Sequence, residues 1–240
     1  MNLIDSLIKE GWLKNPRIIE AFRHIKRVDF LPAAHEVGEP RPLYGREDSK
    51  DLAELNEALP IGYGQTISQP LVVAFMLELL DPQPGEKILD IGSGSGWTSA
   101  LLAYIVSQKG NSKSEILNPK QIPNSKSQIP NGKVVAIEII PELKEFGESN
   151  VAKYNFIEKG VVKFICADGS KGYQKEAPFD KILASASARK LPQAWKEQLK
   201  VGGRIVTPIG TSIWLFVKKS ENEFEETEYP GFVFVPLIEK

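Results

Sequence analysis

Residues 87–97 read KILDIGSGSGW, an apolar run followed by glycine at every second position. The run Lys87–Ile91 has the length and composition of a buried strand, and the apolar residues Trp97–Val106 are typical of a helix that packs against a sheet. Glycines between a strand and a helix let the backbone approach a ligand closely at the carboxyl edge of a parallel sheet. The segment therefore predicts a strand, a ligand-binding turn and a helix, with a tight structural turn as the alternative.

The same alternation continues along the chain. Further strands are predicted at Lys133–Glu138, Val161–Ala167, Phe179–Ala184 and Gly203–Pro208, and further helices at Pro141–Phe156 and Pro192–Leu199. Apolar strands that alternate with helices indicate an α/β fold, Rossmann-like, with a mostly parallel twisted sheet and helices on both faces. Two late strands, Ile213–Lys218 and Phe232–Pro236, have no clear helix between them, so we expect an antiparallel final edge.

The first part of the chain is predicted to form a helical extension of this fold. Apolar residues recur at helical spacing between residues 3 and 8 and again between 18 and 25. A polar, proline-bearing stretch follows at 38–57. The apolar run Leu71–Leu80 is too long and too continuous for a strand and is interpreted as a buried helix.

A low-complexity segment at 107–132 interrupts the predicted sheet. It is rich in Asn, Ser, Lys, Gln and Pro, and the order of residues 121–124 returns at 128–131. Such a composition buries too little apolar surface to offset the entropy cost of ordering it. We expect a flexible insertion without a function of its own, and a partner-binding segment is the alternative.

The charge balance argues against a broad surface for polyanions. Against 31 acidic residues the 240-residue chain has 30 Lys and Arg, for a net charge of −1, so no nucleic-acid partner is expected. The single cysteine, Cys166, rules out an intrachain disulfide framework and favours a reducing compartment. We find no signal peptide and no apolar run of the roughly 18 residues that a membrane span needs. We expect a cytoplasmic monomer that does not bind a membrane.

The glycine spacing decides between cofactor classes. Dinucleotide-binding turns need G-x-G-x-x-G, and the third glycine is replaced by Trp97 when counted from Gly92 and by Ser99 when counted from Gly94. The segment instead resembles the acidic-x-G-x-G-x-G motif of class I methyltransferases, with Asp90 at the strand end. That resemblance implies S-adenosyl-L-methionine as cofactor and S-adenosyl-L-homocysteine as product. The implied binding residues of the turn are Asp90, Gly92, Ser93, Gly94, Ser95 and Gly96.

Two further carboxylates belong to the same resemblance. Glu138 ends the second sheet strand, and its distance from Gly96 is close to the usual ~20 residues once 107–131 is set aside. Glu138 is expected to accept the ribose hydroxyls, with a solvated glutamate as the alternative. Asp168 and Gly169 resemble a G-D-G-x-x-G turn, which implies a bond from the adenine amino group to Asp168. The alternative for Asp168 is an Asx-turn cap.

The most specific motif lies upstream of the glycine turn. Residues 59–70 read LPIGYGQTISQP, which resembles the loop of the protein-L-isoaspartate O-methyltransferases that closes over the meeting point of cofactor and substrate carboxylate. The resemblance implies that Gln65, Thr66, Ile67 and Ser68 contact the cofactor. It also makes Ser68 catalytic, with a hydroxyl that orients the carboxylate. The alternative for Ser68 is the N-cap of the following helix.

This resemblance covers most of the chain, from Phe30–Pro32 to Phe234–Leu237, and includes residues 198–210. Two segments, 38–58 and 185–192, depart from the family pattern and are candidates for substrate contact.

The resemblance implies one methyltransferase domain over residues 1–240. In it, residues 1–80 form the helical and substrate-loop region, and residues 81–240 form the cofactor-binding sheet core. Residues 107–132 are the insertion.

The implied activity is methyl transfer to the free carboxylate of L-isoaspartyl residues in damaged proteins and peptides, which starts repair through a succinimide. A carboxylate with a pKa of about 3.9 needs no base at neutral pH, so alignment and exclusion of water carry the catalysis. No metal is expected. His24 and His35 are interpreted as structural and Cys166 as a packed core residue.

Three alternatives for the function remain. They are a methyltransferase for another carboxylate or small molecule, a nucleic-acid methyltransferase, and a non-catalytic cofactor-binding protein of the same fold.

Overall fold

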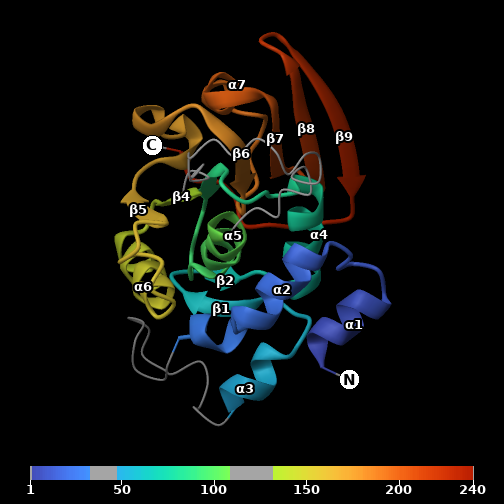
Figure 1. Ribbon diagram of the computed structural model, residues 1–240, viewed down its shortest axis with the longest axis vertical. Helices are drawn as coiled ribbons and strands as arrows, with labels where there is room; N and C mark the ends of the chain where they lie inside the picture. The colour runs from blue at the N-terminus through green and yellow to red at the C-terminus, as the bar shows by residue number, and fades with distance from the viewer. Residues whose placement is uncertain (1, 33–47, 109–131, 240) are drawn as a thin grey trace, which may run out of the picture.

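The computed structural model describes residues 2–32, 48–108 and 132–239, and it contains a large sheet, a separate two-stranded hairpin and helices packed around them (Figure 1). The elements in chain order are α1 Leu3–Lys9, α2 Pro16–His24, the 3-10 helix η1 Arg27–Phe30, α3 Asp48–Ala53, β1 Leu59–Gly62, β2 Gln65–Ile67, α4 Pro70–Leu80, β3 Lys87–Ile91, α5 Trp97–Ser107, β4 Lys133–Glu138, α6 Pro141–Ala152, β5 Val162–Cys166, the 3-10 helices η2 Gly169–Lys171 and η3 Gln174–Glu176, β6 Phe179–Ala184, α7 Gln193–Gln198, β7 Leu199–Ile209, β8 Ser212–Ser220 and β9 Glu223–Pro230.

The large sheet has the strand order β5-β4-β3-β6-β7-β8-β9. Strands β5, β4, β3, β6 and β7 are parallel, and β8 and β9 are antiparallel to their neighbours. The chain builds outward from β3 through β4 and β5 and then returns to the other side of β3 with β6. Open α/β sheets bind ligands in the crevice outside the carboxyl ends of the strands at such a reversal. The predicted α/β fold, with a mostly parallel sheet and helices on both faces, is confirmed.

Successive residues of the central strands pack into two different cores. Ile88 and Val134 belong to the core that includes residues of α4, α5 and α6, whereas Leu89 and Val135 belong to a second core around Trp195 of α7. All five residues are 0% exposed. Burial on both faces of a parallel sheet therefore accounts for the continuous apolar runs in these strands.

The N-terminal helices and the hairpin gather at one end of the molecule, drawn in blue and cyan in Figure 1. The side chains of Asn2 and Asn15 cap α1 and α2 by accepting backbone N–H groups of the first turn. Phe22 of α2 packs edge-on against Trp97 of α5, with ring centroids 5.5 Å apart. Within the described ranges, no helix combines the length and the apolar character needed to cross a membrane.

Several sequence predictions differ from the structure at the sheet edges. The last strand is β9. The prediction of a strand at Phe232–Pro236 is wrong, because only Pro236 pairs there, in a single-residue bridge with Ser187. A strand at an exposed edge needs no apolar residues to pair, so the acidic β9 gave no apolar signal. Cys166, predicted to pack in the core, is exposed, because β5 lies at the opposite edge of the sheet.

Two elements in the first half of the chain were not predicted, and one helix is shorter than expected. The hairpin β1–β2 lies inside the loop motif, and α3 lies inside the polar stretch 38–57. Helix α6 ends at Ala152 rather than Phe156, because the chain turns at Asn155, which has a positive φ of 60°. Residues 33–47, with His35, lie outside the described residues.

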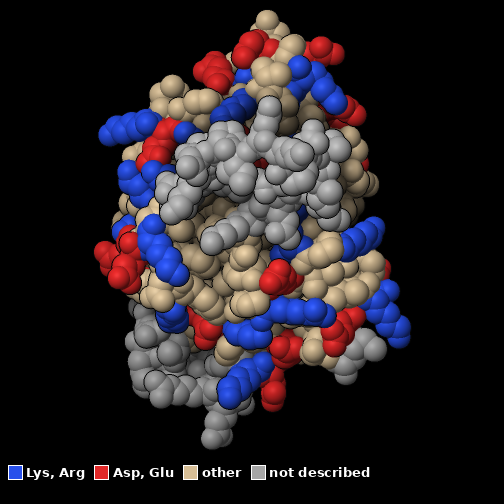
Figure 2. All heavy atoms as spheres, in the orientation of Figure 1, with Lys and Arg blue, Asp and Glu red and all other residues tan. Residues whose placement is uncertain are grey.

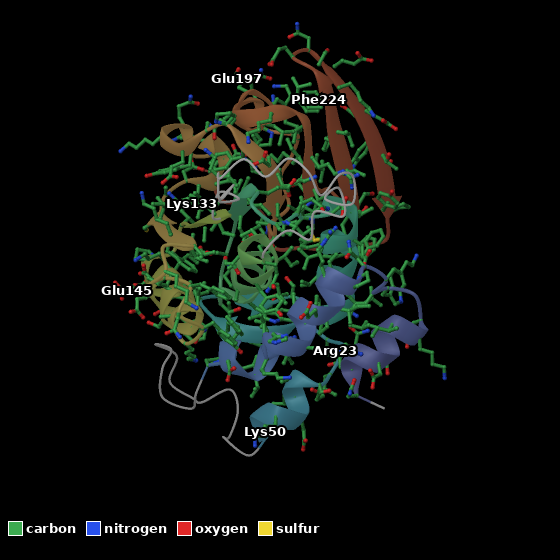
Figure 3. All side chains as sticks on the ribbon, in the orientation of Figure 1. Arg23, Lys50, Lys133, Glu145, Glu197 and Phe224 are labelled. Carbon is green, nitrogen blue, oxygen red and sulfur yellow. The ribbon has the colours of Figure 1, made fainter. Side chains whose placement is uncertain are left out.

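The predicted insertion falls mostly on residues 109–131, which are also outside the described residues. Its described flanks meet at the amino edge of the sheet, where α5 ends at Ser107 and β4 begins at Lys133, labelled in Figure 3. A methyl group added to Gly132 would come within 2.3 Å of the carbonyl oxygen of Val106. The two ends are therefore in contact, at the edge of the sheet opposite to its carboxyl ends.

Charged side chains of both signs are interspersed on the face shown in Figure 2, so neither sign dominates that face. Ion pairs line the amino edge of the sheet, where Lys133 Nζ lies 2.7 Å from Glu176 and Lys200 Nζ lies 2.6 Å from Asp180. Exposed pairs of this kind contribute about 0–1 kcal/mol each.

Candidate active site

A cavity of about 750 Å³, which includes its open mouth, lies at the carboxyl edge of the parallel strands. It sits at the reversal between β3 and β6, where open α/β sheets bind their ligands. The lining residues are 65–68, 91–95, 97–98, 137–140, 167, 169, 185–186 and 235–238.

The glycine turn after β3 is held by backbone contacts that leave little room for side chains. The N–H of Gly92 donates to the carbonyl of Ile137 on β4 at 2.9 Å. Gly92, Gly94 and Gly96 have positive φ values of 74°, 50° and 83°, the region that favours glycine. A methyl group on Gly96 would also lie 2.6 Å from the carbonyl oxygen of Gly147. Glycine at this position therefore lets α5 and α6 pack closely.

Glu138, at the end of β4, holds its carboxylate against the glycine turn. One oxygen accepts the N–H of Gly94 at 3.0 Å, and the other accepts the N–H groups of Ile139 and Ile140 at 2.8 and 3.0 Å. The residue lines the cavity and is 6% exposed, so it is not a solvated glutamate. A carboxylate accepts about four hydrogen bonds, which leaves capacity for at least one hydroxyl.

Asp90 lies beneath the turn and does not reach the cavity wall; it is 0% exposed. Its Oδ2 accepts the hydroxyl of Ser99 at 2.6 Å. Burial raises the pKa of Asp90 from its ordinary 3.8 to about 7, against the lowering effect of the Ser99 hydrogen bond.

Three buried polar atoms around the turn lack a hydrogen-bond partner among the described residues. They are Asp90 Oδ1, Ser93 Oγ and Trp97 Nε1. Buried polar atoms are nearly always paired in folded proteins. Ser93 and Trp97 line the cavity, so a polar ligand or ordered water there could pair with their two atoms, whereas Asp90 does not reach it.

The loop after β5 brings Gly169 to the cavity but gives Asp168 local partners. Asp168 Oδ1 accepts the N–H and the hydroxyl of Ser170 at 2.9 and 2.7 Å, and Oδ2 lies 3.3 Å from Lys171 Nζ. Asp168 thus caps η2, and its predicted bond from adenine stays a prediction. A methyl group on Gly169 would lie 2.4 Å from Ile91 Cγ2, so the chain passes close to the end of β3.

The hairpin β1–β2 forms the wall of the cavity that carries Ser68. Its turn residues Tyr63 and Gly64 have positive φ values of 54° and 69°, as tight two-residue hairpins require. Ile61 is 0% exposed, and its Cδ1 lies 3.4 Å from the place of a methyl group on Gly94. The hairpin therefore packs directly on the glycine turn.

Ser68 lines the cavity and does not occupy the N-cap of α4. Gln69 holds that position without a capping side-chain bond of its own. The N–H of Leu71, in the first turn, donates instead to Asn56 Oδ1 at 2.9 Å. The helix end is thus satisfied by a side chain from elsewhere, and the hydroxyl of Ser68 is not needed for capping.

One wall of the cavity was missed by sequence reasoning. Residues 235–238 line it, and they are held by the loop after β6, where the N–H of Ser187 donates to the carbonyl of Val235 at 2.8 Å and the N–H of Leu237 donates to the carbonyl of Ser187 at 2.9 Å. Ser185 and Ala186 of the same loop also line the cavity. Part of the segment 185–192, which departs from the family's sequence pattern, therefore reaches the site. Backbone pairing between distant segments leaves no local motif that could have predicted this wall.

The predicted cofactor residues line this cavity, except that Asp90, Gly96 and Asp168 are not among its lining residues. Trp97 also lines the cavity and was not predicted to do so. His24 lies on α2, where its ring stacks on Tyr104 with centroids 4.7 Å apart, and it is not among the lining residues.

Comparison with known families decides the assignment, because the sequence model of the protein-L-isoaspartate(D-aspartate) O-methyltransferases matches residues 1–240. The chain belongs to this family. In the structure, residues of the glycine turn and of the 59–70 motif line the same cavity, and Ile61 packs beside Gly94.

Curated proteins named protein-L-isoaspartate O-methyltransferase are similar in sequence to this chain. Those from Methanopyrus kandleri and Aeropyrum pernix are 37% and 38% identical over 240 and 242 residues. The alignments cover 98% and 99% of this chain and 89% and 78% of the relatives. A crystal structure of a Plasmodium falciparum protein of the same description, in complex with S-adenosyl-L-homocysteine, has a TM-score of 0.75 and 20% identity and covers 100% of both chains. This last likeness bears on the fold.

Proposed function

We propose that this protein transfers a methyl group from S-adenosyl-L-methionine to the free carboxylate of L-isoaspartyl residues in damaged proteins and peptides, which starts repair through a succinimide. The observation that carries the proposal is the meeting of the Glu138 carboxylate, the glycine turn and Ser68 in one cavity. The family of the chain and the names of its relatives support the same activity.

The cavity residues suit this cofactor. Glu138 would accept a ribose hydroxyl with its remaining capacity, and the backbone at Gly92 and Gly94 lets a ligand come close. Ser93 lines the cavity, and its unpartnered Oγ suits the polar amino-acid end of such a molecule. The apolar Ile139 and Ile140 line the cavity next to Glu138 and would cover the flat face of a base.

When bound, the cofactor supplies a methyl group on a positively charged sulfur. That methyl group would pass to a carboxylate oxygen of the substrate, the electron pair of the carbon–sulfur bond would stay on sulfur, and no proton transfer would be needed. Ser68 would orient the carboxylate by donating its hydroxyl hydrogen. The hairpin β1–β2 and the segment 235–238 line the cavity and would shield the reacting atoms from water on two sides. Proximity and orientation of this kind supply about 7–11 kcal/mol in favourable systems.

The finer features of the function belong to the same proposal. We infer a cytoplasmic monomer without a nucleic-acid or membrane partner. A net charge of −1 and the mixed charges in Figure 2 support the first of these absences. Residues 1–80 would form the helical and substrate-loop region and residues 81–240 the cofactor-binding sheet core.

The proposal is tested with a synthetic isoaspartyl peptide and its aspartyl twin. Incubation with cofactor carrying a labelled methyl group should give base-labile label in the isoaspartyl peptide and almost none in the twin. Equal labelling of both peptides would contradict the substrate assignment. Tight cofactor binding in calorimetry without label in either peptide would contradict the activity and favour another substrate or a non-catalytic protein.

A further inference from the structure

Arg27 contacts the chain on both sides of the hairpin β1–β2. The residue is 6% exposed and begins η1. Its Nη1 donates to the carbonyls of Ala53 and Leu55 at 3.3 and 3.0 Å, and its Nη2 donates to the carbonyls of Glu57 and Ser68 at 2.6 and 3.3 Å. One guanidinium group thus ties the segment that leads into β1 to the residue that follows β2.

The same guanidinium group reaches the glycine-turn side of the cavity. Its central carbon lies 5.4 Å from the centroid of the Trp97 ring, and Trp97 lines the cavity. A cation over an aromatic face is attracted by the negative face of the ring, more strongly when both groups are shielded from water. Arg27 therefore couples the hairpin to the wall that Trp97 forms.

The hydrogen bond from Arg27 to the carbonyl of Ser68 links this coupling to the reaction. Fixing the direction of that carbonyl restricts ψ of Ser68, and with it the orientation of the peptide planes that carry the side chain. Guanidinium suits the task because it holds several donors in one rigid plane, whereas a lysine ammonium is a compact charge on a flexible stem. Lysine at this position cannot reach carbonyls on both sides of the hairpin with the same geometry.

We propose that Arg27 is a positioning residue for methyl transfer, which sets the hairpin over the cavity and thereby aims the hydroxyl of Ser68 at the substrate carboxylate. The inference rests on the proposed function and adds to it a residue outside both sequence motifs. Arg27 does not line the cavity. It acts through its contacts with Ser68 and Trp97. Replacement of Arg27 should therefore lower the rate of methyl transfer more than the affinity for the cofactor.

The test compares Arg27→Lys with Arg23→Lys, a matched control on α2 that is labelled in Figure 3 and has a half-exposed side chain. Arg27→Lys should lower kcat on the isoaspartyl peptide at least tenfold, with KM and cofactor Kd changed less than threefold. Arg23→Lys should match wild type. Normal kcat per folded molecule in Arg27→Lys would overturn the proposal, whatever its melting temperature.

A double variant separates positioning through Ser68 from general damage. If Arg27 acts through Ser68, Arg27→Lys should change kcat by less than threefold in a Ser68→Ala background, because interacting residues are not additive. A full additional tenfold loss would show an effect unrelated to Ser68. Should Arg27→Lys not fold, Arg27→Gln, which keeps two donors without a charge, replaces it in every assay.

Hydrogen exchange tests the coupling without any substrate. Backbone amides of residues 59–68 should exchange faster in Arg27→Lys than in wild type and Arg23→Lys, and unchanged exchange would refute the coupling. This outcome is independent of the methylation assay. A wild-type protein that labels no isoaspartyl peptide would therefore count against the proposed function and not against the tie between Arg27 and the hairpin.

Discussion

The side chain of Asn56 accepts the backbone N–H of Leu71 at 2.9 Å, across 15 positions of the sequence. Gln69 reinforces the junction, because its side-chain amide donates to the carbonyl of Asn56 at 2.9 Å. Helix α4 is therefore capped by the segment that precedes the hairpin, and Ser68 is spared that role. The capping role of Asn56 and the proposed catalytic role of Ser68 can therefore be tested separately.

Ser68→Ala should lower methyl transfer to an isoaspartyl peptide while cofactor affinity and melting temperature stay close to wild type, because alignment matters during transfer. Asn56→Ala should instead cost about 0.5–2 kcal/mol of stability through loss of the cap. Turnover and thermal unfolding are measured on one preparation of each variant. A destabilised Ser68→Ala with normal turnover would assign the capping role to Ser68 after all.

Glu138→Gln should weaken S-adenosylmethionine binding by about 1.5–3 kcal/mol, the range for hydrogen bonds to a charged group. The amide nitrogen cannot accept the backbone N–H groups that now hold the carboxylate. Titration calorimetry measures the change, with Glu142→Gln on the exposed first turn of α6 as control. Equal affinities of the two variants would remove Glu138 from the cofactor site.

Asp90 should make the protein less stable as the pH rises from about 4 to 7. Its folded pKa is raised, so between the unfolded and the folded value the native state binds more protons than the unfolded chain, and the free energy of unfolding falls with rising pH. Asn cannot titrate, so Asp90→Asn should gain stability relative to wild type between pH 5 and pH 8, a change that urea titrations measure. Parallel stability curves would exclude a raised pKa for Asp90. The exposed Asp51→Asn serves as control.

Replacing residues 109–131 with a short Gly/Ser linker should leave methyl transfer and the melting temperature nearly unchanged. The described ends meet where Gly132 packs against Val106, so a few residues are enough to connect them, and these ends lie at the amino edge of the sheet, away from the cavity. We also expect less proteolytic cleavage, because exposed low-complexity segments are preferred sites. A large fall in melting temperature would show that the segment packs on the fold.

The central strands were predictable because a strand that is buried on both faces consists of a continuous run of apolar residues. Lys87–Ile91, Lys133–Glu138 and Phe179–Ala184 match their predicted ranges. The acidic β9 pairs at an exposed edge, where nothing requires apolar residues, whereas the apolar residues 232–236 predict a strand that does not form. Burial, rather than pairing, is what periodicity detects.

The residues of the site could likewise be predicted only in part. Glu138 and the glycines could be placed because the carboxyl ends of parallel strands meet at one edge of the sheet. The cap from Asn56, the tie from Arg27 and the pairing of Ser187 with Val235 depend on how distant loops fold back. Their partners are largely backbone groups, which every residue type carries, so no motif could reveal them.

Cys166 is the single cysteine of the chain, and it is exposed at the end of β5 in register with Glu138. The next residue, Ala167, lines the cavity. A thiol-reactive fluorophore will therefore attach at one defined position beside the cofactor site without an engineered cysteine. The natural protein provides its own attachment point for an optical reporter, so that occupancy of the cavity can be followed in real time by fluorescence.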